Sequence, residues 1–281
     1  MSTLVPGSHQ QAFHPRSNAR ASLTAFLAII RRDLLVTWRE IATFLLQTLI
    51  QPLFYLFIFG KVLPLIGSAT ARFSALMLPG IVALTLFMTA LQATSIDLSR
   101  DLNVMREIDD RLLAPLPIAL VAGEKVLFAM MRGLVAGACI FPLAFLVLGN
   151  GFQVRGDLLG VLIGLMILVA LMGASLGLLL GTAMSIQQFA LVFPVVLIPL
   201  TFTGCTFYPW ASLSTLKWFQ ILTLFNPLTY AAEGIRHAMI PPVHGHELPT
   251  LALGWILLVL CAAIILCLWG GIRLFHRSVI S

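Results

Sequence analysis

The sequence predicts an all-α polytopic membrane protein, because of its composition, its long apolar runs and the placement of its charges. Of the 281 residues, 59% are hydrophobic and only 10% are charged, and the mean hydropathy is +1.01. Soluble domains carry about 25% charged residues. A chain this apolar cannot cover its side chains in one soluble core, whereas helices that face lipid need not cover them.

Six runs are long and apolar enough to span a bilayer, which takes about 20 residues per helix. They are Ile41–Phe59, Ala75–Ser95, Val126–Leu148, Leu158–Gly181, Phe189–Phe207 and Leu251–Gly271. The expected architecture is six transmembrane helices, with an N-terminal interfacial amphipathic helix and outer re-entrant short helices between spans five and six. We expect residues 1–20 to form a mobile cytoplasmic tail and residues 21–281 to form one transmembrane domain.

The segment 23–39 has the pattern of an amphipathic helix that lies in the plane of the membrane surface. Its apolar residues recur every four positions, at Phe26, Ile30, Leu34 and Trp38. In an interfacial helix, an aromatic side chain lies at the depth of the lipid headgroups and arginine side chains face anionic lipids. The residues expected to make these contacts are Arg31, Arg32, Trp38 and Arg39. The alternative is a cytosolic helix that packs on a soluble partner.

The basic residues predict the orientation of the chain in the cell (inner) membrane. Most of the 17 lysines and arginines fall on one side if both termini are cytoplasmic and the number of spans is even. This bias explains the net charge of +6 better than nucleic-acid binding does, since no basic stripe with interleaved aromatic residues is present.

The segment 208–249 lies outside the cell in this orientation and predicts two short helices. Ser212 or Ser214 is expected to cap the first. The second, Leu228–Met239, has the strong start signal of Asn226 followed by Pro227. Both helices are expected to dip into the outer leaflet.

Glu233 and Arg236 lie within the second of these helices. They are three residues apart, close enough on a helix to pair.

Charges of both signs crowd together only in the segment 100–125, between spans two and three. This coupling loop reads as a charged helix up to Leu113, followed by a break at Pro115 and Pro117. A helix held between two spans can act as a lever, because a partner that grips it tilts both spans. The alternative is a solvated loop without a partner.

Three stretches together resemble the ABC-2-type exporter permeases. They are EIDDRLLAPLPIALVAGEKVL (Glu107–Leu127), PLTFTGCTFYP (Pro199–Pro209) and NPLTYAAEGIR (Asn226–Arg236). Each is weak alone, but all three occur in the family's order. The family commonly has Leu-Ser-Gly where this chain has Phe202, Thr203 and Gly204, a departure that bears on the outer gate.

The resemblance implies a transport subunit of a multidrug or lipid efflux system rather than an enzyme. The first stretch would hold the coupling helix that contacts an ATP-binding-cassette ATPase subunit, through Arg106, Glu107, Asp109, Asp110, Arg111, Leu112 and Leu113. The outer gate would comprise Phe202, Thr203, Gly204, Asn226, Pro227 and Tyr230. A dimer with a second copy or a paralogous permease is implied. ATP and Mg²⁺ would bind the partner subunit, and the substrate would be hydrophobic or amphipathic.

The absence of two sequence features indicates the source of energy for transport. The chain has no Gly-rich loop that would bind ATP phosphates, and no acidic residue near the middle of a predicted span. Asp97 and Arg132 fall toward the inner ends of spans two and three. A separate ATPase is therefore expected. The alternatives are an ion-gradient-driven secondary exporter and, more distantly, an intramembrane enzyme.

Two further motifs have a structural and a chemical interpretation. Gly173–Gly177 (GASLG) matches a serine-hydrolase pattern, but Gly173, Gly177 and Gly181 recur every four residues, which favours close helix packing. His237, His244, His246 and Glu247 are a conceivable metal-ligand set without helical spacing, so no metal site is predicted.

Sparse polar residues interrupt the apolar spans. They are Gln47, Gln51, Thr85, Thr89, Gln92, Thr201 and Thr203. These side chains either line a pathway for an amphipathic substrate or form hydrogen bonds between helices, and the sequence does not decide between the two.

Overall fold

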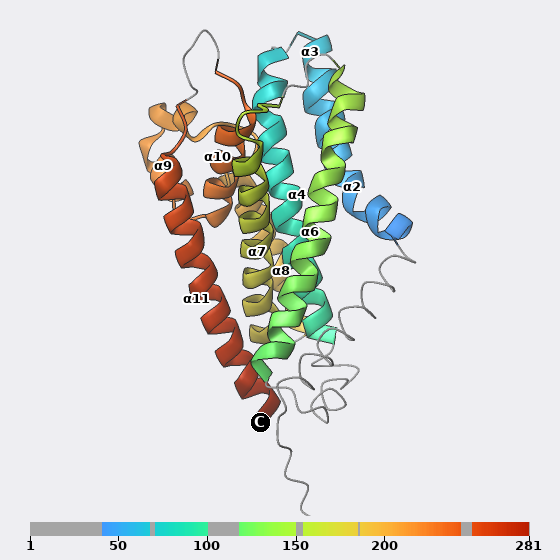
Figure 1. Cartoon of the computed structure of the whole chain (residues 1–281), viewed down its shortest axis with the longest axis vertical. Coiled ribbons are helices and arrows are strands. Elements are labelled where there is room, and N and C mark those ends of the chain that lie inside the picture. The colour runs from blue at the N-terminus through green and yellow to red at the C-terminus, as the bar shows by residue number, and fades with distance from the viewer. Residues whose placement is uncertain are drawn as a thin grey trace, which may run out of the picture.

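The computed structural model describes residues 41–67, 71–100, 118–149, 154–184, 186–242 and 249–280 (Figure 1). The regular elements in this part of the chain are all helices, which confirms the predicted all-α class. In order they are α2 (Ile41–Phe57), the π-helix η1 (Ile58–Val62), α3 (Leu63–Leu65), α4 (Ala71–Arg100), α6 (Ile118–Leu148), α7 (Leu159–Ala183), α8 (Ile186–Thr203), the 3₁₀ helix η4 (Trp210–Thr215), α9 (Lys217–Thr223), α10 (Pro227–Met239) and α11 (Leu253–Ile280).

Five segments among the described residues are long and apolar enough to cross a membrane. They are Ile41–Leu65, Ala75–Ser99, Leu120–Leu148, Leu159–Ala183 and Leu253–His276. The fifth predicted span coincides largely with α8, in which only Pro194–Thr203 forms a shorter apolar helix. A multi-pass membrane protein is thus confirmed, while the count of six spans remains a prediction.

Two helix ends differ from the ends of the predicted spans. The expected lead-in and span three form one helix, since α6 starts at Ile118, directly after Pro117. Helix α8 stops at Thr203, before the predicted end at Phe207. Cys205 adopts a left-handed conformation (φ 50°), a common way to end a helix, and the preceding Gly204 lies against Leu228 where a Cβ would not fit.

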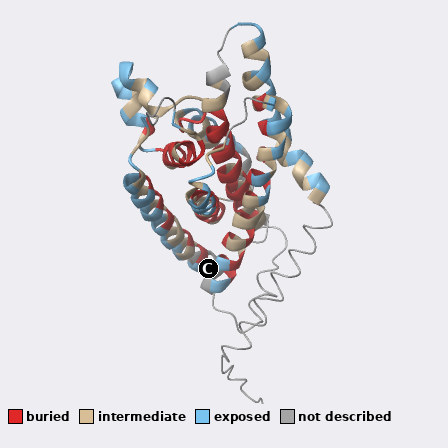
Figure 2. Cartoon of the chain, turned by 45° about the horizontal axis from the view of Figure 1, so that its top comes forward, coloured by how far each residue is buried: buried red, intermediate tan, exposed pale blue. Residues whose placement is uncertain are grey.

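The core is organised around α4. This helix packs most extensively against α7, and then against α6 and α10. Figure 2 shows buried residues gathered along the centre of the bundle, whereas the outer helices carry exposed ones. Helices α2 and α11 are the least buried of the candidate spans.

The glycines of α7 allow it to touch α4 at backbone distance, as the four-residue spacing predicted. A Cβ on Gly173 would lie 2.3 Å from the Phe87 carbonyl oxygen, and one on Gly177 would lie 2.5 Å from the Leu91 carbonyl oxygen. The Ser95 hydroxyl donates a hydrogen bond across this contact to the Gly177 carbonyl at 3.0 Å. Small residues at a helix interface give this close approach.

The outer segment contains the two predicted short helices. Asn226 caps α10 as predicted, because its side chain accepts a hydrogen bond from the Leu228 amide at 2.9 Å. The predicted cap of the first helix is wrong: Leu216 precedes α9, no side chain caps it, and Ser212 and Ser214 lie inside η4.

Helix α10 packs inside the protein, and the expectation that both outer helices dip into the outer leaflet stays a prediction. Most of its residues are buried within the protein. Its alanines and Gly234 let it pack closely against α4, α7 and α11. Helix α9 does expose large apolar side chains, among them Trp218, Ile221 and Leu222.

Candidate functional site

A cavity of about 440 Å³ lies between α2, α4 and α8, with one side chain contributed by α6. It contains six of the seven sparse polar residues that the sequence analysis identified. These are Gln47, Gln51, Thr85, Thr89, Gln92 and Thr201. The cavity also has apolar walls, which include Leu84, Met88, Leu197 and Ile198.

Helical spacing explains how these polar groups gather. Gln47, Gln51 and Tyr55 are four residues apart on α2, and Thr85 and Thr89 are four apart on α4, so each set shares one face of its helix. The Gln51 amide donates to the Tyr55 hydroxyl at 2.8 Å.

Two of the threonine hydroxyls in the cavity donate hydrogen bonds within their own helices. Thr85 donates to the Ile81 carbonyl and Thr201 to the Leu197 carbonyl, both at 2.8 Å. Thr203, the seventh sparse polar residue, donates to the Pro199 carbonyl of its own helix at 2.8 Å, and its hydroxyl oxygen also accepts from the Asn226 amide at 2.9 Å. The six cavity residues thus fit a lining role, and Thr203 fits the role of a bond between helices.

An ion pair lies at the end of the cavity nearest the C-terminal end of α4. Arg132 Nη1 of α6 is 3.7 Å from Asp97 Oδ2, and the side chains are 26% and 32% exposed. The guanidinium carbon also lies 4.6 Å from the centre of the Phe44 ring, within the range of a cation–π interaction. The sequence placed both charges toward the same membrane face but did not predict that they pair.

Aromatic side chains stand at the opposite end of the cavity. Tyr55 packs edge-on against Phe207 with ring centres 5.2 Å apart, and Phe59 and Phe202 lie 5.5 and 6.0 Å from the same ring. Tyr55 and Phe202 line the cavity directly. This cluster lies where α8 ends and the outer segment begins.

The predicted gate residues divide between the cavity and its support. Of the six, only Phe202 lines the cavity. Asn226 ties α10 to α8, because its amide donates to the Leu200 carbonyl at 2.7 Å and to Thr203.

The other gate residues are packed inside the outer segment. Pro227 opens α10, and Gly204 lies against Leu228. Tyr230 donates to the Leu224 carbonyl at 3.0 Å and is buried. These residues can hold the cavity's aromatic end in place without lining it.

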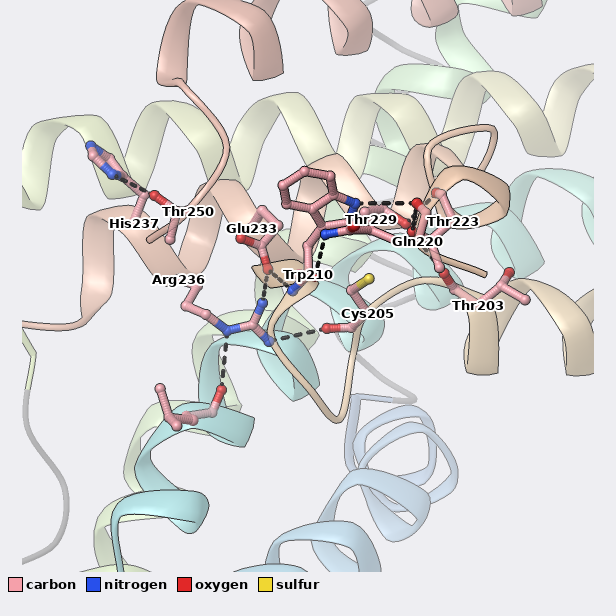
Figure 3. A network of polar contacts seen from close by, with 11 residues as sticks. Thr203, Cys205, Trp210, Gln220, Thr223, Thr229, Glu233, Arg236, His237 and Thr250 are labelled. Atoms are coloured by element: carbon pink, nitrogen blue, oxygen red, sulfur yellow. Dashed lines mark hydrogen bonds and ion pairs between the residues drawn. The ribbon is translucent and has the colours of Figure 1, made fainter. Parts of the chain in front are cut away.

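A buried charge network anchors α10 to its neighbours (Figure 3). Glu233 and Arg236, both fully buried, form the predicted ion pair. Arg236 also donates to the Leu76 carbonyl of α4 at 3.3 Å and to the Cys205 carbonyl at 3.0 Å. Glu233 accepts from the Trp210 amide at 3.0 Å. One pair therefore connects α10, α4, the turn after α8 and η4.

A second, exposed pair lies in the turn before α7. Arg155 donates two hydrogen bonds to the Asp157 carboxylate, at 2.8 and 2.9 Å, and these bonds lower the pKa of Asp157. The Arg155 backbone amide donates to the Met239 carbonyl at the end of α10. This turn is thereby attached to the outer segment, at the opposite end of the bundle from the C-terminal end of α4 and the start of α6 (Figure 1).

Several predicted contact residues lie outside the described part of the chain. They are the coupling residues Arg106, Glu107, Asp109, Asp110, Arg111, Leu112 and Leu113, and the interfacial residues Arg31, Arg32, Trp38 and Arg39. The structure does show that α4 ends and α6 begins at the same end of the bundle (Figure 1).

The serine-hydrolase interpretation of GASLG is contradicted. Ser175 lies inside α7 and donates to the Leu171 carbonyl of the same helix, so the strand-to-helix turn that a nucleophile needs is missing. As for the metal-ligand set, His237 lies 3.2 Å from the Thr250 hydroxyl, and His244, His246 and Glu247 fall outside the described residues.

Known proteins match most of the chain. Residues 24–240 match the family described as ABC-2 type transporter. The inner membrane transport permease YadH of Escherichia coli K12 is 27% identical over 237 residues, which cover 81% of this chain and 88% of the permease. The permease of the same name from Shigella flexneri matches to the same extent. With its apolar helical bundle and a match over most of its length, the chain belongs to the ABC-2 type transporter family.

Proposed function

We propose that this chain is the membrane-spanning subunit of an ATP-driven exporter that moves a hydrophobic or amphipathic substrate out of the cytoplasm or inner leaflet. Such a substrate would be a drug-like molecule, a lipid or a glycolipid. The observation that carries the proposal is the cavity between α2, α4 and α8, whose wall combines amide and hydroxyl groups with aliphatic and aromatic side chains. Its volume of about 440 Å³ falls within the range typical of small-molecule sites.

The helices around the cavity support a dimer with a second copy or a paralogous permease. Helix α2 exposes Leu46, Ile50 and Phe54, and α8 exposes Leu191 and Val195. A second subunit against these faces would enclose the polar wall and keep it away from lipid, where unpaired polar groups are costly.

The connection between α4 and α6 supports the coupling role of the segment 100–125. Helix α4 supplies much of the cavity wall and α6 supplies Arg132. A force on the chain between these two helices would reach the cavity without an intermediate element. In this proposal ATP and Mg²⁺ bind the separate ATPase subunit, and both termini of this chain are cytoplasmic.

Replacing both Glu107 and Arg111 by Ala is expected to weaken ATPase association and ATP-driven transport by about tenfold or more, since charge pairs at a protein interface contribute on the order of 1.4 kcal/mol or more. Co-purification with the ATPase subunit and transport into inverted vesicles measure the two effects. The double variant Arg155→Ala/Asp157→Ala is the matched control, because it removes one charge of each sign from the turn before α7, outside the segment 100–125. Normal association and transport in the Glu107/Arg111 variant would contradict the coupling role.

The secondary-exporter alternative makes the opposite prediction in the same system. Proteoliposomes that contain only this chain should not accumulate substrate when an ion gradient is imposed. Accumulation without ATP and without the ATPase subunit would establish the gradient-driven carrier instead.

A further inference from the structure

Arg132 is a cation on the wall of the cavity, and one of its N–H donors has no hydrogen-bond partner within the described structure. Its Nε is buried and has no hydrogen-bond partner in the described structure. Its Nη1 is 3.7 Å from Asp97 Oδ2, an ion-pair distance that is too long for a hydrogen bond. A guanidinium group carries five N–H donors and no acceptor. A guanidinium group on a cavity wall can donate hydrogen bonds to a ligand that carries acceptor oxygens.

The surroundings of Arg132 favour an anionic acceptor. The Phe44 ring lies under the guanidinium at 4.6 Å and limits its orientation, while 26% of the side chain stays exposed. Planar, bidentate contacts to phosphate or carboxylate are the strongest that a guanidinium makes. Burial in an otherwise apolar bundle strengthens such a contact relative to water.

We propose that Arg132 binds the phosphate or carboxylate headgroup of an anionic amphiphile, and that Asp97 is the counter-ion which this headgroup displaces. The inference rests on the proposed transport function and specifies its substrate class. Asp97 pairs with the guanidinium before the headgroup binds. When the headgroup arrives, Arg132 exchanges a long ion contact for direct hydrogen bonds.

The rest of the cavity fits the other parts of such a molecule. Lining residues on α4 run from Asp97 to Leu84, about 20 Å along the helix at 1.5 Å per residue. Beyond Asp97, the polar residues Gln92, Thr89 and Thr85 alternate along this wall with apolar residues such as Met88 and Leu84. On the facing helix α8, Leu197 and Ile198 are apolar. The cavity therefore has a charged group at one end and a mixed wall of neutral polar and hydrocarbon groups beyond it, which suits a molecule with an anionic headgroup and an amphipathic body.

Binding of matched probes to the purified full chain in a maltoside detergent tests this assignment. The anionic probe is a fluorescent dodecyl phosphate, and the neutral probe is the corresponding alcohol with the same fluorophore. Fluorescence anisotropy measures both affinities. The variant Arg132→Gln is expected to bind the phosphate probe about tenfold or more weakly, and to bind the alcohol within about twofold of the wild type.

The variant Asp97→Asn should act in the opposite direction. It removes the competing carboxylate while keeping its size, so the phosphate probe is expected to bind about threefold or more tightly. The variant Arg132→Lys retains the charge without the planar fork, and intermediate binding is expected. Gel filtration and thermal unfolding show whether each variant is folded, and the gain expected for Asp97→Asn tests the proposal even if Arg132→Gln does not fold.

Three results would overturn the proposal. The first is equal affinity of wild type and a folded Arg132→Gln for the phosphate probe, and the second is weaker phosphate binding in Asp97→Asn. The third is inorganic phosphate competing as effectively as dodecyl phosphate, which would identify a free-anion site instead of an amphiphile headgroup. Failure of the transport proposal has a different signature, because it appears in the vesicle transport assay and leaves the probe affinities unchanged.

Discussion

Replacing Arg236 by Met is expected to lower the free energy of unfolding by about 3–5 kcal/mol, because it leaves the Glu233 carboxylate buried without its counter-charge. Glu233 is fully buried, and its Oε2 has no hydrogen-bond partner in the described structure. The substitution also removes the donors to the Leu76 and Cys205 carbonyls. Unfolding by SDS in mixed micelles, followed by tryptophan fluorescence, measures the loss.

The double variant Glu233→Gln/Arg236→Met separates charge burial from packing. With both charges gone, part of the lost stability is expected to return, since removing a whole buried pair costs less than breaking it. Arg155→Met is the control: it breaks an ion pair whose Asp157 side chain is 60% exposed, and it should change stability by less than about 1 kcal/mol. Wild-type stability of Arg236→Met would show that the network does not hold α10 in place.

The Cys205 thiol offers an independent measure of the same network. Cys205 is fully buried in the turn that Arg236 binds. After the other three cysteines are replaced by Ala, the native protein should resist thiol labelling, and Arg236→Met should speed the labelling. Unchanged labelling in a destabilised variant would place the loss of structure elsewhere in the bundle.

Adding one methyl group at Gly173 is the second substitution with a large expected effect. A Cβ there would lie 2.3 Å from the Phe87 carbonyl oxygen and 3.0 Å from the Phe87 carbonyl carbon. Because these are backbone atoms, α7 and α4 must separate to make room, and Gly173→Ala should cost roughly 2–3 kcal/mol. The same SDS titration measures the effect.

Gly164→Ala in the same helix is the matched control. Nothing lies within 4 Å of a Cβ at Gly164, and alanine favours a helix over glycine by up to about 1 kcal/mol. The two substitutions are chemically identical and should change stability in opposite directions. Equal effects at both positions would contradict the close α4–α7 contact.

Local features of the sequence predicted local structure well. Asn226 and Pro227 predicted the start of α10, since a cap needs only the residues beside it. The spacing of Gly173, Gly177 and Gly181 predicted a close helix contact, because residues four apart share a helix face. Neither pattern states which helix lies opposite, and the structure identifies it as α4.

The candidate site was predictable in part. The polar residues of α2, α4 and α8 stood out against their apolar neighbours, yet their gathering around one cavity depends on helices distant in the sequence. The pairing of Arg132 with Asp97 likewise joins two separate helices. The sequence analysis did not predict the burial of α10, whose alanines and Gly234 are small enough to let this helix pack closely against its neighbours.

The sequence by itself determined that this protein is a helical membrane protein, that charges collect between α4 and α6, and that it resembles the family to which it belongs. Composition and periodicity suffice for these conclusions because lipid acts on each helix separately. Only the tertiary structure decided that α4 is central, that Glu233 and Arg236 anchor α10, and that Arg132 stands in a cavity with amide and hydroxyl groups. These features depend on which helix faces meet, and that is set by side-chain shape and pairing between helices rather than by the pattern along any one of them.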